Sequence, residues 1–257
     1  MMGTTCNVPH AGRTPLQTIV ALIRSVATYV VLGLYVLVVG PIAMLLALVS
    51  RSSEFLFIPG RIGVAAALAL VGIRCRLAGG DHVPAGGVIF CSNHESNVDG
   101  PVLFLALHPR LRALYKAEFD KVPILSHAMR LARFVPINRS NRQLAAQSIE
   151  RAASLTREGF SFLIFAEGTR SPTGELLPFK KGGFIMALLA QAPIVPLAIT
   201  GTRDAMRKGS ALIHAATASV RIGRPVETRG MTIDDRDRLV MEVRARIQAL
   251  LAEGPVD

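Results

Sequence analysis

The stretch GGVIFCSNHESNVDGPVLFLAL, residues 86–107, has the pattern of a strand, a polar loop and a helix in direct succession. Residues 88–92 are largely apolar and of strand length, residues 93–98 are polar and turn-prone, and Pro101 suits the first turn of a helix over residues 101–107. Because strands that alternate with helices are typical of α/β proteins, this stretch predicts a sheet flanked by helices.

The loop of this stretch carries a histidine and an aspartate five positions apart, His94 and Asp99. In a continuous helix, residues five apart point about 140° away from each other, because each residue turns by about 100°. In a loop that turns into a helix, Asp99 lies at the helix mouth and can reach back to the imidazole. The pair then predicts a general base whose tautomer is fixed by a carboxylate. A loop histidine beside a helix-capping aspartate is the alternative.

No protein nucleophile accompanies this pair. Ser92 and Ser96 lie nearby, but neither stands in a G-x-S-x-G motif, and the chain contains no such motif. The simplest interpretation is that the attacking hydroxyl belongs to the substrate.

A second polar segment, FAEGTRS at residues 165–171, follows an apolar run of strand length over residues 161–166. Open α/β sheets place ligand sites at this end of their strands. Gly168 lets the backbone approach a ligand closely, and the guanidinium of Arg170 suits bidentate binding of a phosphate. Two lysines follow in PFKKGG, residues 178–183. The segment predicts an anion-binding loop, with an ordinary turn and a local ion pair as the alternative.

Strand and helix patterns alternate along the rest of this part of the chain. Further strands are expected over residues 112–115, 133–137, 162–166 and 194–199, and further helices near residues 124–131, 142–157 and 184–191. Ser140 can cap the helix over 142–157 and Gly159 can end it. After residue 210 a strand pair or extended run leads to a last amphipathic helix over residues 234–252. The alternation predicts a mixed, mostly parallel sheet flanked by helices.

An uncharged run over residues 25–50 precedes this part and exceeds the ~20 residues that span a bilayer. Gly40-Pro41 interrupts the run, so a bent or re-entrant helical hairpin competes with a single span. A second apolar stretch, residues 62–73, is too short to cross alone and could lie in the interface or pack against the first. We expect residues 1–75 to form a helical membrane anchor and residues 76–257 the α/β domain. A buried core helix in a soluble domain is the alternative.

Composition restricts the partners. A net charge of +11 indicates attraction to an anionic membrane surface and to phosphorylated substrates. Nucleic acid is disfavoured, because the chain has no Trp, 3 Tyr and no zinc-finger or helix-turn-helix motif. Cys6, Cys75 and Cys91 are too dispersed for a disulfide framework or a metal site, which fits a reduced cytoplasmic setting. The histidines lack H-E-x-x-H spacing and no nucleotide-binding glycine loop occurs, so we expect no metal and no nucleotide cofactor.

Four segments in order, NHESNVD, FVPINR, FAEGTRS and IVPLAI, resemble the four sequence blocks of the glycerolipid acyltransferases, most closely the lysophosphatidic acid acyltransferases. The similarity covers roughly residues 88–200. The second block lacks the glycine with which it usually begins. Two further positions depart from the pattern, since the family usually has proline at Ala166 and an acidic residue at Asn138.

The resemblance implies that His94 is the catalytic base and Asp99 its partner. It implies a site for the acceptor's phosphate formed by Arg139, Glu167, Gly168, Thr169 and Arg170, with Lys116 where relatives often carry a basic residue. Within it, the arginines are expected to donate to the phosphate and Glu167 to fix a guanidinium. The fourth block is credited with acyl-donor binding or with structure. Pro196 inside a strand-like run fits a sheet edge or a bulge, which favours the structural role.

The resemblance further implies an enzyme that needs no cofactor and transfers a fatty acyl group from acyl-coenzyme A or acyl carrier protein. The acceptor is the free sn-2 hydroxyl of lysophosphatidic acid, and the product is phosphatidic acid for phospholipid biosynthesis. The catalytic domain is expected on the cytoplasmic face of the inner membrane. Another lysolipid acceptor, such as a lyso-ornithine lipid, and a non-catalytic membrane lipid-binding protein are the alternatives. A thioesterase or lipase is disfavoured by the missing serine motif.

Overall fold

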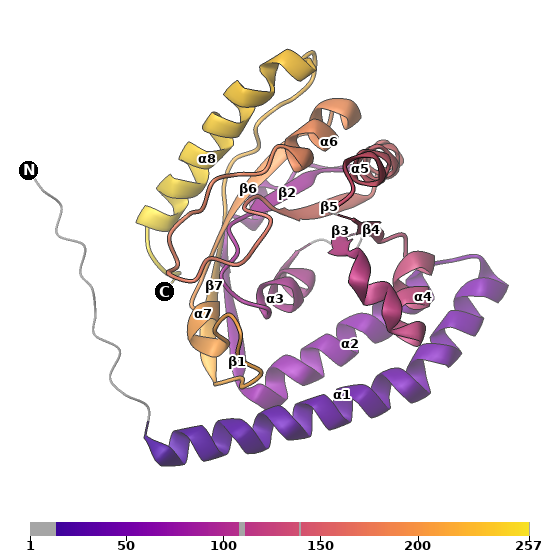
Figure 1. Cartoon of the computed structure of the whole chain (residues 1–257), viewed down its shortest axis with the longest axis vertical. Coiled ribbons are helices and arrows are strands. Elements are labelled where there is room, and N and C mark those ends of the chain that lie inside the picture. Colours follow the sequence, from indigo (N-terminus) through magenta and orange to yellow (C-terminus); the bar gives the residue numbers. More distant parts are fainter. Residues whose placement is uncertain (1–13, 108–110, 139, 257) are drawn as a thin grey trace, which may run out of the picture.

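Within residues 14–107, 111–138 and 140–256, which the computed structural model describes, seven strands form one sheet in the order β1-β7-β6-β2-β5-β3-β4 (Figure 1). All neighbouring strands are parallel except β6 and β7. The mixed, mostly parallel sheet predicted from the sequence is therefore confirmed. The strands are β1 (Ile73–Ala78), β2 (Ile89–Ser92), β3 (Leu111–Lys116), β4 (Val135–Ile137), β5 (Ser161–Phe165), β6 (Ile194–Thr200) and β7 (Ala216–Ile222).

Helices cover both faces of this sheet (Figure 1). The α-helices of the α/β part are α3 (Asp99–Ala106), α4 (Pro123–Leu131), α5 (Arg142–Arg157), α6 (Gly182–Ala190), α7 (Thr202–Ala205) and α8 (Arg236–Ala252). Short 3-10 turns connect some of them: η1 (Gly80–His82), η2 (Ala117–Lys121) and η3 (Ile233–Asp235). The expected helices agree with these bounds to within about two residues, and α5 agrees at both ends.

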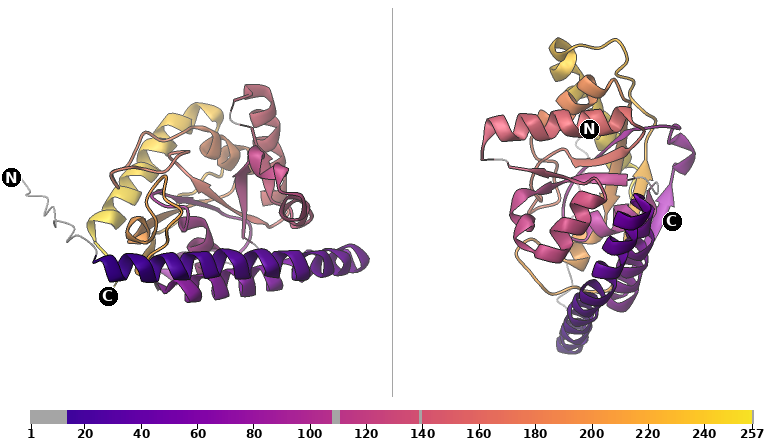
Figure 2. Two further views of the ribbon diagram at one scale, coloured as in Figure 1. Left: turned by 60° about the horizontal axis from the view of Figure 1, so that its bottom comes forward. Right: turned by 90° about the vertical axis from the view of Figure 1, so that its right-hand side faces the viewer.

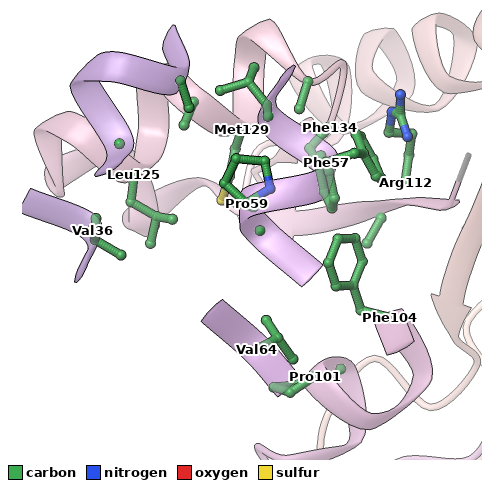
Figure 3. A pocket seen from close by; sticks show the side chains of 18 of the residues that line it. Val36, Phe57, Pro59, Val64, Pro101, Phe104, Arg112, Leu125, Met129 and Phe134 are labelled. Atoms are coloured by element: carbon green, nitrogen blue, oxygen red, sulfur yellow. The ribbon is translucent and has the colours of Figure 1, made fainter. Parts of the chain in front are cut away.

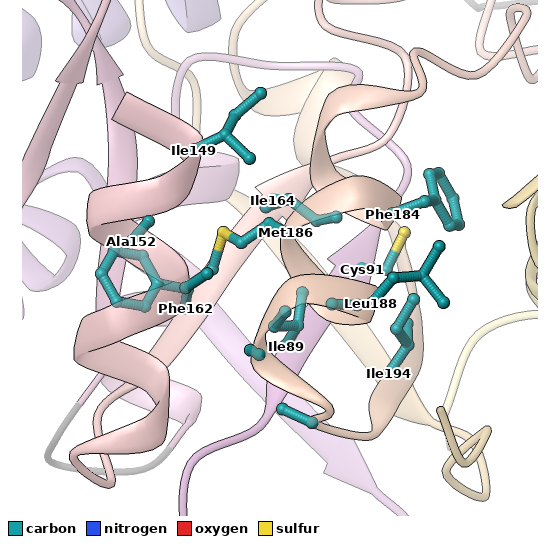
Figure 4. Packing of buried hydrophobic residues seen from close by; sticks show 14 of the residues in the cluster. Ile89, Cys91, Ile149, Ala152, Phe162, Ile164, Phe184, Met186, Leu188 and Ile194 are labelled. Carbon is teal, nitrogen blue, oxygen red and sulfur yellow. The ribbon is translucent and has the colours of Figure 1, made fainter. Parts of the chain in front are cut away.

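The central strands are buried on both faces, which explains why they are apolar without alternation. Ile89 and Cys91 of β2 point into a cluster with residues of α5 and α6, including Phe184 and Met186 (Figure 4). Phe90, between them, belongs to the opposite cluster, together with Leu103 of α3. Strand side chains point to alternate faces, so the short run VIFC supplies both cores.

Two long helices, α1 (Pro15–Ser50) and α2 (Glu54–Val71), form a hairpin along one side of the sheet and its helices (Figure 2). α1 runs through Pro41, so of the two alternatives left open by the sequence a hairpin that turns at Gly40-Pro41 is wrong. The turn comes instead at Arg51, whose φ of 53° ends the helix. The hydroxyl of Tyr35 donates to the carbonyl oxygen of Pro59 in α2 (2.9 Å). The second apolar helix therefore packs against the first, which is one of the two arrangements expected from the sequence.

The hairpin also contacts the α/β part directly. Ser25 Oγ accepts a hydrogen bond from the backbone N–H of Ile213 (2.8 Å), and the hydroxyl of Tyr29 donates to the carbonyl oxygen of Ala211 (2.7 Å). β1 follows α2 at once and joins the sheet beside β7, so the boundary expected at residues 75 and 76 falls inside this strand. The alternation of apolar and basic residues in IRCRL, residues 73–77, is the sequence signal for β1.

The polarity of α1 is the reverse of that in a soluble core helix. Its buried side chains are small or polar: Ala21, Ser25, Thr28, Ala43 and Ala47. Large apolar side chains on the outer face are more than half exposed, among them Leu34, Leu37, Leu45 and Leu48. Both helices are long and apolar enough to cross a membrane, judged by length and composition alone. Because only 11% of the most apolar window of α1 is buried, the alternative of a buried core helix is wrong.

Pro196 lies in β6, which has neighbours on both sides, so a sheet edge is the wrong position for it. β6 pairs with β7 from Leu197 onwards, and Ile194 bridges separately to Val226. Between these pairings residues 195–196 face residues 223–225, so the ladder is irregular where proline has no N–H to donate. The bulge alternative fits this arrangement.

Smaller differences concern turns. Asn141 rather than Ser140 caps α5, because its side-chain oxygen accepts from the backbone N–H of Leu144 (3.1 Å). β4 is shorter than expected, since Arg133 has a φ of 64° and belongs to the turn after α4. After residue 210 the described chain forms one strand, β7, before α8, so of the two expected arrangements the strand pair is wrong. Gly159, with a φ of 92°, follows the end of α5 as expected.

Candidate active site

The two polar segments meet at the carboxyl end of the sheet. β2 and β5 are adjacent and parallel, with Ser92 opposite Phe165, so the loops that follow them start side by side. The backbone N–H of Ser171 donates to the carbonyl oxygen of His94 (2.7 Å). Residues 93–99 and 165–171 therefore form one site although they are far apart in the sequence.

His94 and Asp99 are in contact within this site. His94 Nδ1 lies 2.7 Å from Asp99 Oδ2, and the histidine side chain is 18% exposed while the aspartate is fully buried. Asp99 Oδ2 also accepts from the backbone N–H groups of Glu95 (2.8 Å) and Ser96 (2.9 Å). Asp99 is the first residue of α3, where the helix dipole favours negative charge. Nδ1–H then donates to a carboxylate surrounded by donors, which leaves Nε2 as the free base nitrogen.

The ring of Phe165 packs against the face of the His94 imidazole. The two rings stack with centroids 3.8 Å apart and an interplanar angle of 16°. Phe165 is the last residue of β5, so the imidazole lies between the ends of the adjacent strands β2 and β5.

Glu167 supports the same loop. Its Oε1 accepts from the backbone N–H of His94 (2.9 Å) and its Oε2 from that of Leu177 (3.0 Å). Burial raises the pKa of Glu167, and the two backbone donors act against that rise. The carboxylate therefore ties the histidine loop to the segment after β5. Its expected action on a guanidinium in a phosphate site stays a prediction.

Ala166, where the resemblance leads one to expect proline, makes a bond that proline could not make. Its backbone N–H donates to the carbonyl oxygen of Ser92 (3.0 Å). The alanine thus extends the pairing of β2 and β5 by one hydrogen bond directly beneath the histidine loop.

The loop with Gly168, Thr169 and Arg170 adjoins a lysine that the sequence analysis did not single out. Lys208 Nζ lies 3.0 Å from the carbonyl oxygen of Arg170 and 3.4 Å from Thr169 Oγ1. Arg170 Nη1 is buried and has no hydrogen-bond partner among the residues that the structure describes. Gly168 has a φ of 68°, and a Cβ there would lie 3.0 Å from Lys180 Cγ, so a side chain would be strained and crowded.

Two further phosphate ligands, Lys116 and Arg139, were expected from the sequence. Lys116, at the end of β3, is exposed and forms an ion pair with Glu118 (3.1 Å). Arg139 lies outside the residues that the structure describes, so its expected role stays a prediction.

Glu95 and Thr202 complete the buried cluster, and the sequence analysis missed both. Thr202 Oγ1 lies 3.0 Å from Glu95 Oε1 and is hydrogen-bonded to Asp99 Oδ1. Burial, and then the charge of Asp99, raise the pKa of Glu95 to about 7. Thr202 follows β6 and stands 103 positions from Asp99, so no local sequence pattern joins the two.

An apolar cavity of about 450 Å³ borders the site, between α1, α2, α3 and α4 and the strands β3 and β5 (Figure 3). Phe165, which stacks on His94, forms part of its wall. Arg112 is the one charged side chain among the described residues that line it, and its guanidinium lies 3.7 Å from the centroid of the Phe57 ring. Its size and lining are typical of pockets for an elongated apolar ligand. Other lining residues are Val36, Pro59, Phe104, Leu125, Met129 and Phe134.

Within the described ranges, no three histidine, cysteine, aspartate or glutamate side chains gather as a metal ion would require. The expectation that the protein needs no metal stays a prediction.

Residues 74–200 match the family model described as "Acyltransferase". The 1-acyl-sn-glycerol-3-phosphate acyltransferase of Limnanthes alba is 36% identical over 172 residues, which are 66% of this chain and 61% of that protein. The human 1-acyl-sn-glycerol-3-phosphate acyltransferase alpha is 32% identical over 190 residues, 73% of this chain and 67% of that protein. The chain thus spans about three fifths of the length of the Limnanthes relative.

The fold is similar to that of a solved structure, the 1-acyl-sn-glycerophosphate (LPA) acyltransferase PlsC from Thermotoga maritima. The TM-score is 0.80, and the similarity covers 94% of this chain and 99% of that chain. At 20% sequence identity this likeness shows the fold.

Proposed function

Because the chain belongs to the acyltransferase family, which includes 1-acyl-sn-glycerol-3-phosphate acyltransferases, we propose that it transfers a fatty acyl group from a thioester to lysophosphatidic acid. The observation that carries the proposal is the contact of His94 with Asp99 beside an apolar cavity of about 450 Å³. A base next to a space for a hydrocarbon chain is what an enzyme needs to join an alcohol to a fatty acyl group.

The reaction follows from the geometry of the pair. Nε2 of His94 takes the proton of the acceptor's hydroxyl while the oxygen attacks the thioester carbonyl carbon. Asp99 stabilises the imidazolium that forms. The tetrahedral intermediate then collapses, the C–S bond breaks, and the imidazolium returns its proton to the leaving thiolate. The products are an ester and a free thiol, and no cofactor takes part.

We place the acceptor's phosphate beside Arg170. Its buried Nη1 can donate to a phosphate oxygen, and Lys208 and Thr169 lie next to the same loop. With the phosphate held there, the hydroxyl at sn-2 reaches His94 and the product is phosphatidic acid. Acyl-coenzyme A and acyl carrier protein are both compatible donors.

Arg170→Lys is expected to raise the KM for the acceptor about tenfold or more and to leave the KM for the donor nearly unchanged. Lysine keeps the charge but loses the planar fork that binds two phosphate oxygens at once. Steady-state kinetics with each substrate varied in turn measures both constants. Arg151→Lys, an exposed position on α5, is the matched control. An equal change in both constants would contradict a phosphate clamp at Arg170.

We assign the cavity to the acyl chain of the donor, because its wall reaches the catalytic histidine through Phe165. Gly40→Leu is expected to shift donor preference toward shorter chains, since a Cβ at Gly40 would already lie 2.9 Å from Ile124 Cγ2, and both residues line the cavity. Gly33→Leu is the matched control on the same helix, because a Cβ there meets nothing within 4 Å. Competition between donors of different length measures the preference. The same shift in both variants would show that the cavity does not hold the acyl chain.

The hairpin supports attachment to a membrane at the catalytic face. The side of α1 that faces the protein is buried from Ala21 to Ala47, so the helix lies along the α/β part and does not project from it. This arrangement favours insertion of the outer face into one leaflet, with anionic headgroups drawn to the basic protein. Cys75 and Cys91 are free thiols, which fits a catalytic part on the cytoplasmic face of the inner membrane.

The experiment that tests the function is an acyl-transfer assay of the purified full chain in detergent or vesicles. Several lysolipid acceptors, including a lyso-ornithine lipid, are combined with acyl-coenzyme A and acyl carrier protein donors. We expect ester formation with lysophosphatidic acid and release of one thiol per ester. Transfer only to another lysolipid would change the acceptor, and binding without any transfer would identify a lipid-binding protein.

A further inference from the structure

A single hydroxyl lies between two buried carboxyl groups next to the catalytic histidine. Thr202 Oγ1 lies 3.0 Å from Glu95 Oε1 and is hydrogen-bonded to Asp99 Oδ1. Thr202 and Asp99 are fully buried, and Glu95 is 7% exposed. Water therefore has little access to these three side chains, and they must satisfy one another.

The number of protons decides how they do so. A threonine hydroxyl has one hydrogen to donate. Asp99 acts as an acceptor, because its second oxygen, Oδ2, accepts hydrogen bonds from His94 Nδ1 and from two backbone N–H groups. The Thr202 hydrogen therefore belongs to Asp99 Oδ1, and only lone pairs of Thr202 Oγ1 face Glu95. The contact at 3.0 Å is a hydrogen bond only when Glu95 itself carries a proton.

We propose that Glu95 acts in its protonated form as a positioning residue, which donates to Thr202 and through it holds Asp99 in place against His94. This inference rests on the proposed acyl transfer, in which His94 is the base. It gives the glutamate of NHESNVD a function that its place in the motif does not reveal.

Burial favours the neutral form of the Glu95 carboxyl group, whereas two backbone N–H donors of α7 favour the carboxylate. The backbone N–H of Arg203, on α7, donates to Glu95 Oε1 (3.2 Å). The loop after β5 also approaches Glu95, since a Cβ at Gly174 would lie 3.9 Å from Oε2. Burial and the nearby charge of Asp99 raise the pKa of Glu95 to about 7. Charged and titratable groups on the elements around it include His94, Asp99, Glu167, Arg170, Glu175, Arg203, Asp204 and Lys208.

The sign of the pH effect follows. Above about pH 7 Glu95 loses its proton, and two carboxylates then compete for the one hydrogen of Thr202. Asp99 is held less firmly and a second negative charge is placed beside it. Turnover should therefore fall as the pH rises through about 7 and Glu95 loses its proton.

The test compares Glu95→Gln with Glu95→Ala in the full chain. The amide of glutamine donates to Thr202 at every pH, so Glu95→Gln should recover the turnover that Glu95→Ala loses, about tenfold, and should abolish the alkaline decline. Thr202→Val removes the connection and should lower turnover by about tenfold at all pH values, whereas Thr202→Ser keeps the hydroxyl and should keep the wild-type profile. Circular dichroism confirms that each variant is folded.

Two results would overturn the inference. One is an unchanged alkaline decline in folded Glu95→Gln, and the other is a loss of turnover in Glu95→Gln as large as in Glu95→Ala. Infrared difference spectroscopy gives a readout without activity, since a protonated carboxyl band should disappear near pH 7 in the wild type and be absent from Glu95→Gln. If the wild type transferred no acyl group at all, the proposed function would fail, while the infrared titration would still decide the protonation of Glu95.

Discussion

Replacing His94 with alanine is expected to lower turnover at least about 100-fold, the usual scale of general-base catalysis, without unfolding the protein. The loop is held by its backbone, through Glu167 on the N–H of His94 and Ser171 on its carbonyl oxygen, so it survives the loss of the imidazole. Release of free thiol from the donor in the presence of acceptor measures turnover. His127→Ala, at an exposed histidine of α4, is the matched control.

Asp99→Asn tests the role of the carboxylate in the same experiment. An asparagine amide can donate to Nδ1, which would put the proton on Nε2 and remove the base. We expect a loss of up to about 10⁴-fold in turnover, the size of the effect when the aspartate of a Ser-His-Asp triad is replaced by asparagine. Near-normal turnover in a folded His94→Ala protein would show that the pair is structural.

Substituting lysine for Leu34 and Leu45 together is expected to abolish attachment to membranes in high salt. Both side chains are about three fifths exposed on the outer face of α1, at 58% and 62%. Moving a lysine into a bilayer costs roughly 3 kcal/mol more than moving a leucine, which is on the order of 100-fold in partitioning for each position. Because lysine adds positive charge, a loss of attachment cannot come from weaker attraction to anionic lipid.

Co-sedimentation with anionic vesicles at low and high salt measures this effect, since salt screens electrostatic contacts and leaves hydrophobic insertion in place. The control is the pair Leu144→Lys and Met241→Lys, which are exposed apolar residues on α5 and α8, on the other face of the sheet. If the substituted α1 still bound vesicles in high salt, the attachment would have to reside elsewhere on the protein.

Features that depend on a few neighbouring residues could be predicted from the sequence. His94 and Asp99 are five positions apart, and the strand, loop and helix around them are each set by a few neighbouring residues. The parallel sheet followed from the alternation of strands and helices. The sequence left a turn at Gly40-Pro41 and a continuous helix open, because the packing of α1 against α2 and α4 cannot be seen in a local pattern.

Contacts between segments far apart in the chain could not be predicted from local sequence patterns. Thr202 reaches Asp99 only because α7 follows β6, the strand next to β2. The bonds of Glu167 to the backbone N–H groups of His94 and Leu177 join segments 73 and 10 positions apart, and no local pattern predicts them. β1 was overlooked because the apolar helix before it runs into it without a polar break.

The hydrogen bond between Ser25 and Ile213 spans 188 positions of the chain, and that between Tyr29 and Ala211 spans 182. During synthesis α1 can therefore meet these partners only after the 182 to 188 positions that separate them have been made. Until then its large apolar side chains have nothing of this protein to cover them, and a nascent chain in that condition is prone to aggregate. Early contact of α1 with the lipid bilayer would shelter it during this interval. Folding would then be completed at the membrane surface, when the segment around residues 211–213 docks onto a helix that is already in place.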